Sequence, residues 1–446
     1  MNRISIDFNQ KNGVIKPLHA VNNGPVYKFG DSMRVTNIDA FIEAGIPYVR
    51  NHDAAFCAYY GGEHIVDVHA IFPNFDADPY DPASYDFIMT DEYVRVCEYA
   101  GCKTFYRLGS KIEHGIKKYG TLPPKDFHKW AVICEHIIRH YTEGWANGFH
   151  YDMEYWEIWN EADGNDDDAP DKLCWGGTHA EFYELYHIAA THLKKCFPHL
   201  KIGGPANSGR IKLVEEFIKQ CKAPLDFFSW HRYKPDPAPV MEFARKVRGY
   251  LDENGFTETE SILDEWNYVR SFSGEDWIYS LRREKDIKGA AYIAAMMCEC
   301  QREPVDMLMY YDARPCGMNG MFNTDLVCDK LKGYYPFPMF NTLYKIKENV
   351  TVSSDVQGIY LCAAANEKEA AVMITHFNDD DSTAPVTVEL DFRSFGCNDG
   401  TEIEILVLDE TRDLVAINKS TYFGTRFVTE LSFPNFTSYL IKLKKK

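Results

Sequence analysis

The sequence of 446 residues has no uninterrupted apolar run of the length, about 18 residues, that a membrane-spanning helix needs. Its first residues, MNRISIDFNQKNG, lack the apolar stretch of a secretory signal peptide. The 13 cysteines are scattered, odd in number and without a C-x-x-C pair, which indicates reduced thiols and argues against a disulfide framework. We therefore expect a cytoplasmic protein that does not insert into membranes.

Positive charge and metal-binding spacings are also scarce. The chain carries 48 Lys and Arg against 66 Asp and Glu, a formal net charge of −18. This balance argues against binding to nucleic acid or to anionic membranes, since both attract a basic surface. No H-x-H or HExxH spacing occurs, and the acidic segment Asp163–Asp171 does not begin a calcium loop, which needs Gly and Glu at fixed positions. We expect no metal and no cofactor.

The chain does contain an alternation of short apolar runs and amphipathic helical stretches. Continuous hydrophobicity is typical of strands that are covered on both faces. The eight runs span residues 16–21, 47–53, 103–109, 155–161, 201–206, 226–233, 261–267 and 305–312. Helices are predicted between them, most clearly at 126–141, 211–221, 285–300 and from Thr178, which begins a capping-box pattern with Glu181. The alternation predicts an α/β fold, a (β/α)8 TIM barrel over residues 15–349, with 54–84 as a loop over its mouth.

The rhythm changes after about residue 350. Short runs, several of them strictly alternating, predict strands at 371–377, 385–392, 402–409, 426–433 and 438–444. This pattern is typical of an antiparallel β-sandwich, which we assign to residues 350–446. Ile4, Ile6 and Phe8 also alternate, so the segment 1–14 is expected to add one strand to that accessory domain.

Two of the predicted barrel strands stop on a carboxylate that lies beside Trp and Asn. They are found in the stretches EYWEIWNEADGND and ESILDEWNY, in the fourth and seventh strands. Because a TIM barrel carries its chemistry at the C-terminal ends of its strands, Glu161 and Glu265 are expected to meet there. Two such carboxylates can act on one glycosidic bond, at about 5–5.5 Å in retaining enzymes and about 6.5–9.5 Å in inverting ones.

Other pairs of carboxylates in these strands fit less well. Glu157 and Glu161 are on one side of a strand but roughly 13 Å apart, at about 3.3 Å per residue. Asp264 and Glu265 are adjacent and are expected to point to opposite faces. We predict that Glu157 and Asp264 stabilise the barrel, for instance by pairing with Arg50.

The motifs WEIWNE and LDEWN resemble the acid/base and nucleophile motifs of glycoside hydrolase family 39, in clan A. PYVRNHD, KIGGPA, DFFSWHRY and KGYYPFPMFNTLYKI are similar to other signatures of that family and follow in the same order, so the resemblance covers about residues 15–350. It implies a retaining glycosidase in which Glu161 is the general acid/base and Glu265 the nucleophile. A departure is Ala162, which stands where the family usually has Pro; we expect the acidic segment that follows it to be a solvated loop on the leaving-group side.

The resemblance also implies contacts to the substrate. Asn160 matches a residue that binds a sugar hydroxyl, and Tyr233 one that orients Glu265. Arg50, His52 and His231 match further motif residues, and Trp266 or Tyr310 is expected to line the sugar subsite. A structural role is the alternative for Arg50, His231, Trp266 and Tyr310.

The expected activity is that of an exo-acting β-xylosidase or a related glycosidase on short oligosaccharides. An α-L-arabinofuranosidase or an α-L-iduronidase-like enzyme on the same scaffold is the alternative. Two readings of other classes are an inactive carbohydrate-binding protein and a metal-dependent hydrolase that uses His52, Asp53 and His231. The sequence also allows a homo-oligomer and leaves the sugar, its anomeric configuration and the linkage open.

Overall fold

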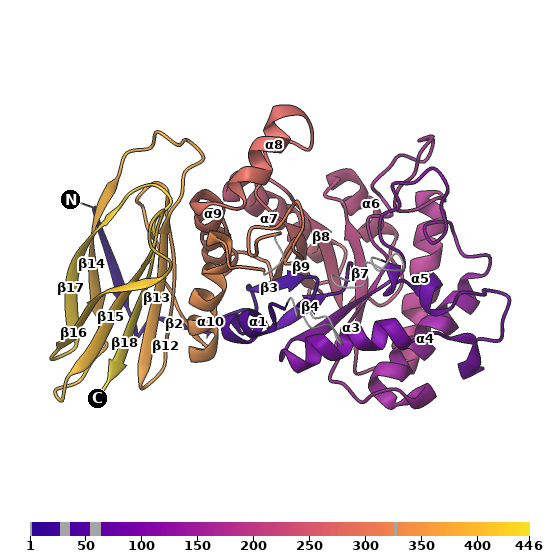
Figure 1. The fold of residues 1–446 in the computed structure, drawn as a ribbon, viewed down its shortest axis with the longest axis horizontal. Helices are drawn as coiled ribbons and strands as arrows, with labels where there is room; N and C mark the ends of the chain where they lie inside the picture. Colours follow the sequence, from indigo (N-terminus) through magenta and orange to yellow (C-terminus); the bar gives the residue numbers. More distant parts are fainter. Residues whose placement is uncertain (1, 27–35, 54–63, 325–327) are drawn as a thin grey trace.

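The structure is a computed structural model and describes residues 2–26, 36–53, 64–324 and 328–446. It consists of a barrel ringed by helices and a β-sandwich beside it (Figure 1). None of the described helices is long and apolar enough to cross a bilayer.

The barrel is closed and is built from eight parallel strands, as predicted. In chain order they are β3 (Ala20–Asn22), β4 (Tyr48–Arg50), β5 (Lys103–Leu108), β6 (Tyr155–Ile158), β7 (Lys201–Asn207), β8 (Phe227–His231), β9 (Glu260–Trp266) and β10 (Met307–Tyr310). Pairing of β10 with β3 closes the ring. Phe105, Phe227 and Met309 belong to an apolar layer that fills the lumen. The barrel is therefore a packed core, and reactive groups belong at its open ends.

The helices that cover the barrel lie largely where the sequence predicts them. They are α1 (Ile38–Ala44), α3 (Ile88–Tyr99), α4 (Phe127–Glu143), α5 (His179–Cys196), α6 (Ile211–Gln220), α7 (Pro237–Glu253), α9 (Ile287–Cys300) and α10 (Pro336–Ile346). An additional helix, α8 (Gly274–Arg283), follows β9. The capping box at the start of α5 is present, because Thr178 and Glu181 each bond to the other's backbone.

The predicted loop over residues 54–84 is only partly described. Residues 54–63 lie outside the described part of the chain. The prediction of a plain loop is wrong for the remainder, which holds α2 (Val68–Ile71) and the 3₁₀ turn Pro82–Ser84. Asp67 anchors this segment, because its buried carboxylate accepts hydrogen bonds from Arg107 and from the backbone of Lys111.

The accessory domain is a β-sandwich of two sheets, as predicted. One has seven strands in the order β16 (Val415–Tyr422), β15 (Thr401–Leu408), β18 (Ser438–Lys445), β13 (Glu369–His376), β12 (Ile359–Ala365), β11 (Glu348–Val350) and β2 (Lys11–Val14). The other has three, in the order β1 (Asn2–Asp7), β14 (Val386–Arg393) and β17 (Arg426–Phe433). The pairing of β1 with β14 is parallel, so the second sheet is mixed and not purely antiparallel. The division at residues 349 and 350 stays a proposal, and β11 lies across it.

Four strands of the sandwich escaped the sequence analysis, each for a physical reason. β2 has four residues, all of them exposed, so it carries no apolar signal. β12 reads IYLCAAA, and alanine carries little strand signal although the strand is almost fully buried. β16 is exposed along most of its length, so it shows no apolar alternation. β11 has only three residues.

The seven-stranded sheet packs against the barrel as well as against its partner sheet. Val372 and Ile374 of β13 face the sandwich interior, whereas Met373 joins the core of the barrel. Across this contact, the Sγ atoms of Cys298 in α9 and Cys362 in β12 are 3.6 Å apart. Burial on both faces explains why β13 shows a continuous apolar run.

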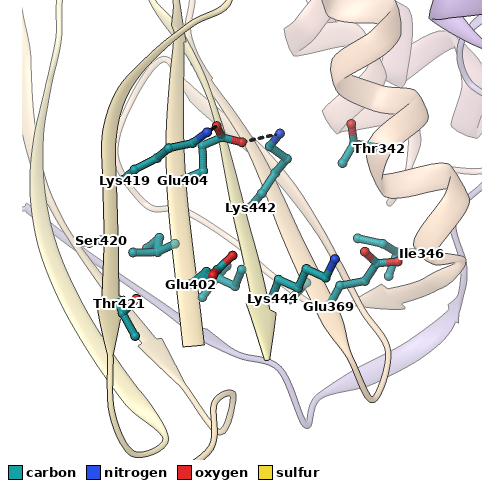
Figure 2. A pocket seen from close by; sticks show the side chains of 13 residues that line it. Thr342, Ile346, Glu369, Glu402, Glu404, Lys419, Ser420, Thr421, Lys442 and Lys444 are labelled. Carbon is teal, nitrogen blue, oxygen red and sulfur yellow. Dashed lines mark ion pairs between the residues drawn. The ribbon is translucent and has the colours of Figure 1, made fainter. Parts of the chain in front are cut away.

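A groove of about 470 Å³ lies between α10 and the seven-stranded sheet (Figure 2). Its walls carry charged side chains that pair with one another: Glu404 lies between Lys419, at 2.8 Å, and Lys442, at 2.5 Å. No aromatic ring is among the described residues that line it. The groove therefore lacks the flat apolar surface on which sugar rings commonly stack.

Candidate active site

Glu161 and Glu265 converge at the C-terminal end of the barrel. Glu161 follows β6, and Glu265 lies near the end of β9. One oxygen of each carboxylate and one ring nitrogen of His231 all lie within 4.8 Å of one another. The Nδ1 atom of His231 is hydrogen-bonded to Oε1 of Glu161 at 2.7 Å and lies 3.4 Å from Oε2 of Glu265. This separation is short enough for both carboxyl groups to reach one anomeric carbon.

The chain makes a tight turn to present Glu161. Trp159 has a φ of 75° and Glu161 a φ of 47°, both in the left-handed region that residues other than glycine rarely adopt. Backbone hydrogen bonds hold the turn, from Trp159 N to Leu108 O at 2.7 Å and from Glu161 N to Ala206 O at 3.0 Å. Strain of this kind costs about 1–3 kcal/mol and persists only where the surroundings enforce it, commonly at functional sites.

Arg50 links several polar side chains of the site through its guanidinium. Its buried guanidinium contacts Glu157 at 2.7 Å, Asp264 at 3.2 Å and Glu265 at 2.7 Å. A further bond, at 2.7 Å, runs to Oδ1 of Asn160. The prediction that Arg50 pairs with Glu157 and Asp264 is thus confirmed. Its guanidinium is fully buried and its bonds go to protein groups, which is the arrangement of the structural alternative, a residue that positions the site.

The prediction that Asp264 and Glu265 point to opposite faces is wrong, since both contact Arg50. The reason is a bulge in β9. Trp230 of β8 is opposite Leu263, but the next residue, His231, is opposite Glu265. The register with β10 shifts at the same place. A bulge inserts one residue and turns the following side chain, which breaks the simple alternation of a strand.

Charged groups around Glu265 oppose the effect of burial on its pKa. Burial alone would raise the pKa of Glu265, but electrostatic interactions with His231, His52 and Arg50 outweigh it and hold that pKa below its usual value. Burial alone would lower the pKa of His231, but Glu265 and Asp264 raise it well above its usual value. Glu265 is therefore held as a carboxylate and His231 as a cation.

Glu157 has the opposite tendency. Burial raises its pKa, and the nearby charge of Asp264 raises it further, although Arg50 pulls it down. The pKa of Asp264 is lowered, because Arg50 and His231 outweigh its burial. A proton is thus held on Glu157, which leaves two cations, Arg50 and His231, facing the two anions Asp264 and Glu265.

Tyr233 and His52 flank Glu265. The hydroxyl of Tyr233 donates a hydrogen bond to Oε2 of Glu265 at 2.8 Å. The Nε2 atom of His52 lies 3.6 Å from Oε1 of Glu265, and its Nδ1 atom lies 3.3 Å from Asp53. Both oxygens of the carboxylate are therefore held by neighbouring side chains.

Trp266 and Tyr310 do not line the site, which corrects the expectation from the sequence. Both side chains are fully buried. Trp266 packs against Tyr292 of α9 and against Tyr310, and Tyr310 packs against Phe337 of α10. They belong to the layer between the barrel and its helices.

The residue next to Tyr310 is one that the sequence analysis missed. Tyr311 is only partly buried and packs edge-on against the ring of His52, with ring centroids 5.5 Å apart. Its hydroxyl lies 3.5 Å from Asp53. The aromatic pair in the run VDMLMYYD was the available signal, but the side chain that faces the site is the second of the two.

Asp163, in the acidic segment Asp163–Asp171, and Cys174, just after it, are two further neighbours of Glu161. The expectation of a solvated loop is wrong for Asp163, which is buried and accepts hydrogen bonds from the backbone and hydroxyl of Ser208, each at 2.9 Å. Burial raises the pKa of Asp163 to about 6. Just beyond the segment, the Sγ atom of buried Cys174 lies 3.9 Å from Oε2 of Glu161. No motif pointed to Cys174.

Within the described residues, some side chains have the spacing to hold a metal ion. At the site itself these are Glu161, His231 and Glu265, but the cationic His231 and Arg50 already neutralise this position. Elsewhere they are the groups His64, Asp67, His69 and Glu135, His192, Cys196. The chemistry that this arrangement supports is acid–base and nucleophilic.

Comparison with known proteins places this site in a family. The model described as glycosyl hydrolases family 39 matches residues 36–309. A β-xylosidase of Caldicellulosiruptor saccharolyticus is 28% identical over 229 residues, which are 47% of this chain and 42% of that protein. A β-xylosidase of Geobacillus stearothermophilus is 28% identical over 162 residues, or 34% of this chain and 29% of that protein. The matched region thus spans less than half of either relative.

Solved structures share the complete architecture. A glucosidase from Croceicoccus marinus superimposes with a TM-score of 0.79 at 22% identity, over 100% of this chain and 99% of the other. A monomeric β-xylosidase from Caulobacter crescentus has a TM-score of 0.71 at 16% identity over 100% of both chains. These likenesses show the fold, a TIM barrel with a sandwich. Because the family model covers more than half of the 446 residues, the chain belongs to glycosyl hydrolase family 39.

Proposed function

We propose that the protein is a retaining glycoside hydrolase that acts by double displacement. The observation that carries the proposal is the approach of Glu161 and Glu265, whose carboxylate oxygens come within 4.8 Å. An inverting enzyme needs a wider gap, about 6.5–9.5 Å, to hold a water molecule between the sugar and its base.

In the first step, the carboxylate of Glu265 attacks the anomeric carbon while the bond to the leaving group breaks. Glu161 gives its proton to the departing oxygen. In the second step, Glu161 takes a proton from water, the water oxygen attacks the same carbon, and the bond to Glu265 breaks. The lowered pKa of Glu265 suits the role, because a nucleophile must be ionised before it attacks.

The surrounding side chains support these roles. Tyr233, His52 and Arg50 fix the orientation of Glu265, and His231 contacts both glutamates. Asn160, held by Arg50, follows β6 directly before Glu161, where it can bind a sugar hydroxyl next to the reacting carbon.

For the substrate we propose a β-xyloside or a related short glycoside, hydrolysed from its end in the cytoplasm. The support is the similarity to two β-xylosidases. An arabinofuranoside is the second candidate, because a protein described as an arabinofuranosidase shares the fold with a TM-score of 0.67 at 14% identity. An iduronidase-like activity is a third possibility on the same scaffold.

A panel of aryl glycosides tests the proposal: β-xyloside, α-arabinofuranoside, α-arabinopyranoside, β-galactoside and β-glucuronide. Proton NMR of the first product from the best substrate should show the anomeric configuration of that substrate. A 2-fluoro glycoside of the same sugar should label Glu265, as read by peptide mass spectrometry.

Four outcomes would contradict the proposal. Inverted product would exclude double displacement, and a label on another residue would exclude Glu265 as the nucleophile. Activity lost in a chelator would favour a metal-dependent hydrolase. Binding of sugars without any turnover by the wild type would favour an inactive carbohydrate-binding protein.

A further inference from the structure

An exposed aromatic surface lies on the rim of the barrel beside the catalytic pair. Phe272, in the segment that joins β9 to α8, exposes 58% of its surface. Trp277, in the first turns of α8, packs against it with ring centroids 5.4 Å apart. Ile278 beside it is 51% exposed. Large apolar side chains that gather on a surface commonly mark a binding site.

This surface is continuous with the site. The ring of Phe272 packs edge-on against Tyr233, with centroids 5.3 Å apart. Tyr233 in turn donates its hydrogen bond to Glu265 at 2.8 Å. A single side chain therefore separates the exposed ring from the proposed nucleophile.

The opposite side of the mouth has a different chemistry. Asp53, after β4, contacts His52 at 3.3 Å, Lys111 at 2.9 Å and Arg314 at 3.1 Å. This side is buried and charged. It suits the sugar whose bond is cleaved, because every hydroxyl group of that sugar needs a hydrogen-bonding partner.

The order of the strands indicates which part of the substrate faces the exposed aromatic rings: the leaving group. Glu161, after β6, meets the departing oxygen, and Tyr233 and Phe272 follow β8 and β9. The ring order β6, β7, β8, β9 places these three residues on one arc, whereas His52, Lys111 and Arg314 lie on the arc from β10 to β5. The exposed aromatic rings therefore lie on the same arc of the mouth as Glu161, the residue that would protonate the departing oxygen.

The sandwich domain holds this rim in place. Asp379, in the loop after β13, accepts bonds from Arg270 at 3.0 Å and from Lys288 at 2.8 Å. Lys288 is almost fully buried and also pairs with Asp381 at 2.7 Å. Arg270 is two residues from Phe272, so the contact fixes the backbone that presents the ring. Figure 1 shows α8 projecting from the barrel on the side of this loop.

We propose that Phe272, supported by Trp277, is the binding platform for the leaving group, and that the preferred leaving group is a sugar or aryl ring with a flat apolar face. The inference rests on the proposed glycosidase function and adds the chemical class of the group on the far side of the bond. Stacking of such a ring on Phe272 removes apolar surface of both from water.

The test compares two leaving groups on one sugar in the variant Phe272→Ala. With an aryl or disaccharide substrate, kcat/KM should fall by about tenfold, the order expected when one aromatic contact is lost. With the glycosyl fluoride of the same sugar, kcat/KM should not change, because fluoride has no ring to stack. Phe272→Tyr should retain the wild-type values. Phe423→Ala, which removes a ring 69% exposed on the sandwich, is the matched control and should change neither substrate.

The outcomes separate the two proposals. An equal fall on both substrates would show that Phe272 acts through Tyr233, and unchanged values on both would show that the leaving group does not reach it. Either result overturns the platform and leaves the glycosidase intact. A wild-type protein that cleaves no glycosyl fluoride would instead overturn the proposed function, and the platform with it.

Discussion

The mouth of the barrel and the interior of the sandwich bury side chains of opposite kinds. At the mouth, Arg50, Glu157 and Asp264 are fully buried and are held in one network. Between the two sheets of the sandwich, the core consists of apolar side chains such as Ile374, Leu390 and Ile441. Both regions are well packed, but only the mouth of the barrel carries the free-energy cost of desolvating charged side chains.

The two kinds of buried side chain contribute differently to the stability of the fold. A buried ion pair gains little for folding, since desolvation of the charges offsets most of their attraction. A buried leucine or isoleucine contributes directly, by about 1.5–3 kcal/mol. We infer that the charged network at the mouth is there to set the protonation and direction of Glu265, and that the sandwich supplies stability and a fixed rim.

The largest expected effect comes from the two glutamates, which should respond differently to the leaving group. Glu161→Ala should lose about 10²–10⁴-fold in rate on natural linkages, the usual worth of general acid catalysis, yet keep most of its glycosylation rate with dinitrophenolate. Azide should rescue its second step, because that anion needs no base. Glu265→Ala should stay inactive with every leaving group, since the atom that forms the covalent bond is gone. Steady-state kinetics of both variants measures these responses. An identical response of the two variants would contradict the roles.

A smaller effect is expected on the pH profile. Glu265 must be ionised to attack, and its pKa is held below the ordinary 4.5, so kcat/KM should decline only below pH 4.5. The same shift contributes stability above the unfolded pKa, and this contribution is lost as pH falls through the folded one. His231→Asn removes a cation that lowers the pKa of Glu265 and should move the acid limb to higher pH.

His128→Asn, at an exposed position on α4, is the control for that experiment and should leave the limb where it is. An acid limb that stays unchanged in His231→Asn would show that His231 does not set the ionisation of Glu265. The inference that the charged network at the mouth sets the protonation of Glu265 would then be wrong.

The smallest effect on catalysis is expected from the sandwich core. Leu390→Ala removes a fully buried side chain and should lower the free energy of unfolding by about 2–5 kcal/mol. Turnover measured well below the melting temperature should not change, because the loop that carries Asp379 keeps its contacts. Thermal unfolding and kcat together test this. A large fall in kcat without a loss of stability would mean that the sandwich takes part in catalysis.

The sequence by itself determined the periodic features of this protein. Continuous apolar runs predicted all eight barrel strands, because a strand covered on both faces must be apolar throughout. The C-terminal ends of those strands then identified Glu161 and Glu265, since a barrel gathers these ends at one mouth. The capping box before α5 was readable because its bonds are local.

Only the tertiary structure decided which neighbouring side chains face the site. The bulge at Asp264 turns two adjacent carboxylates towards Arg50. Tyr310 and Tyr311 are also adjacent, yet the first is fully buried and the second lies at the mouth. The contact between Asp379 and Arg270 joins segments more than a hundred residues apart. Such features depend on strand register and on packing between distant elements, and these leave no periodic pattern in the sequence because a single residue shifts a side chain to the other face.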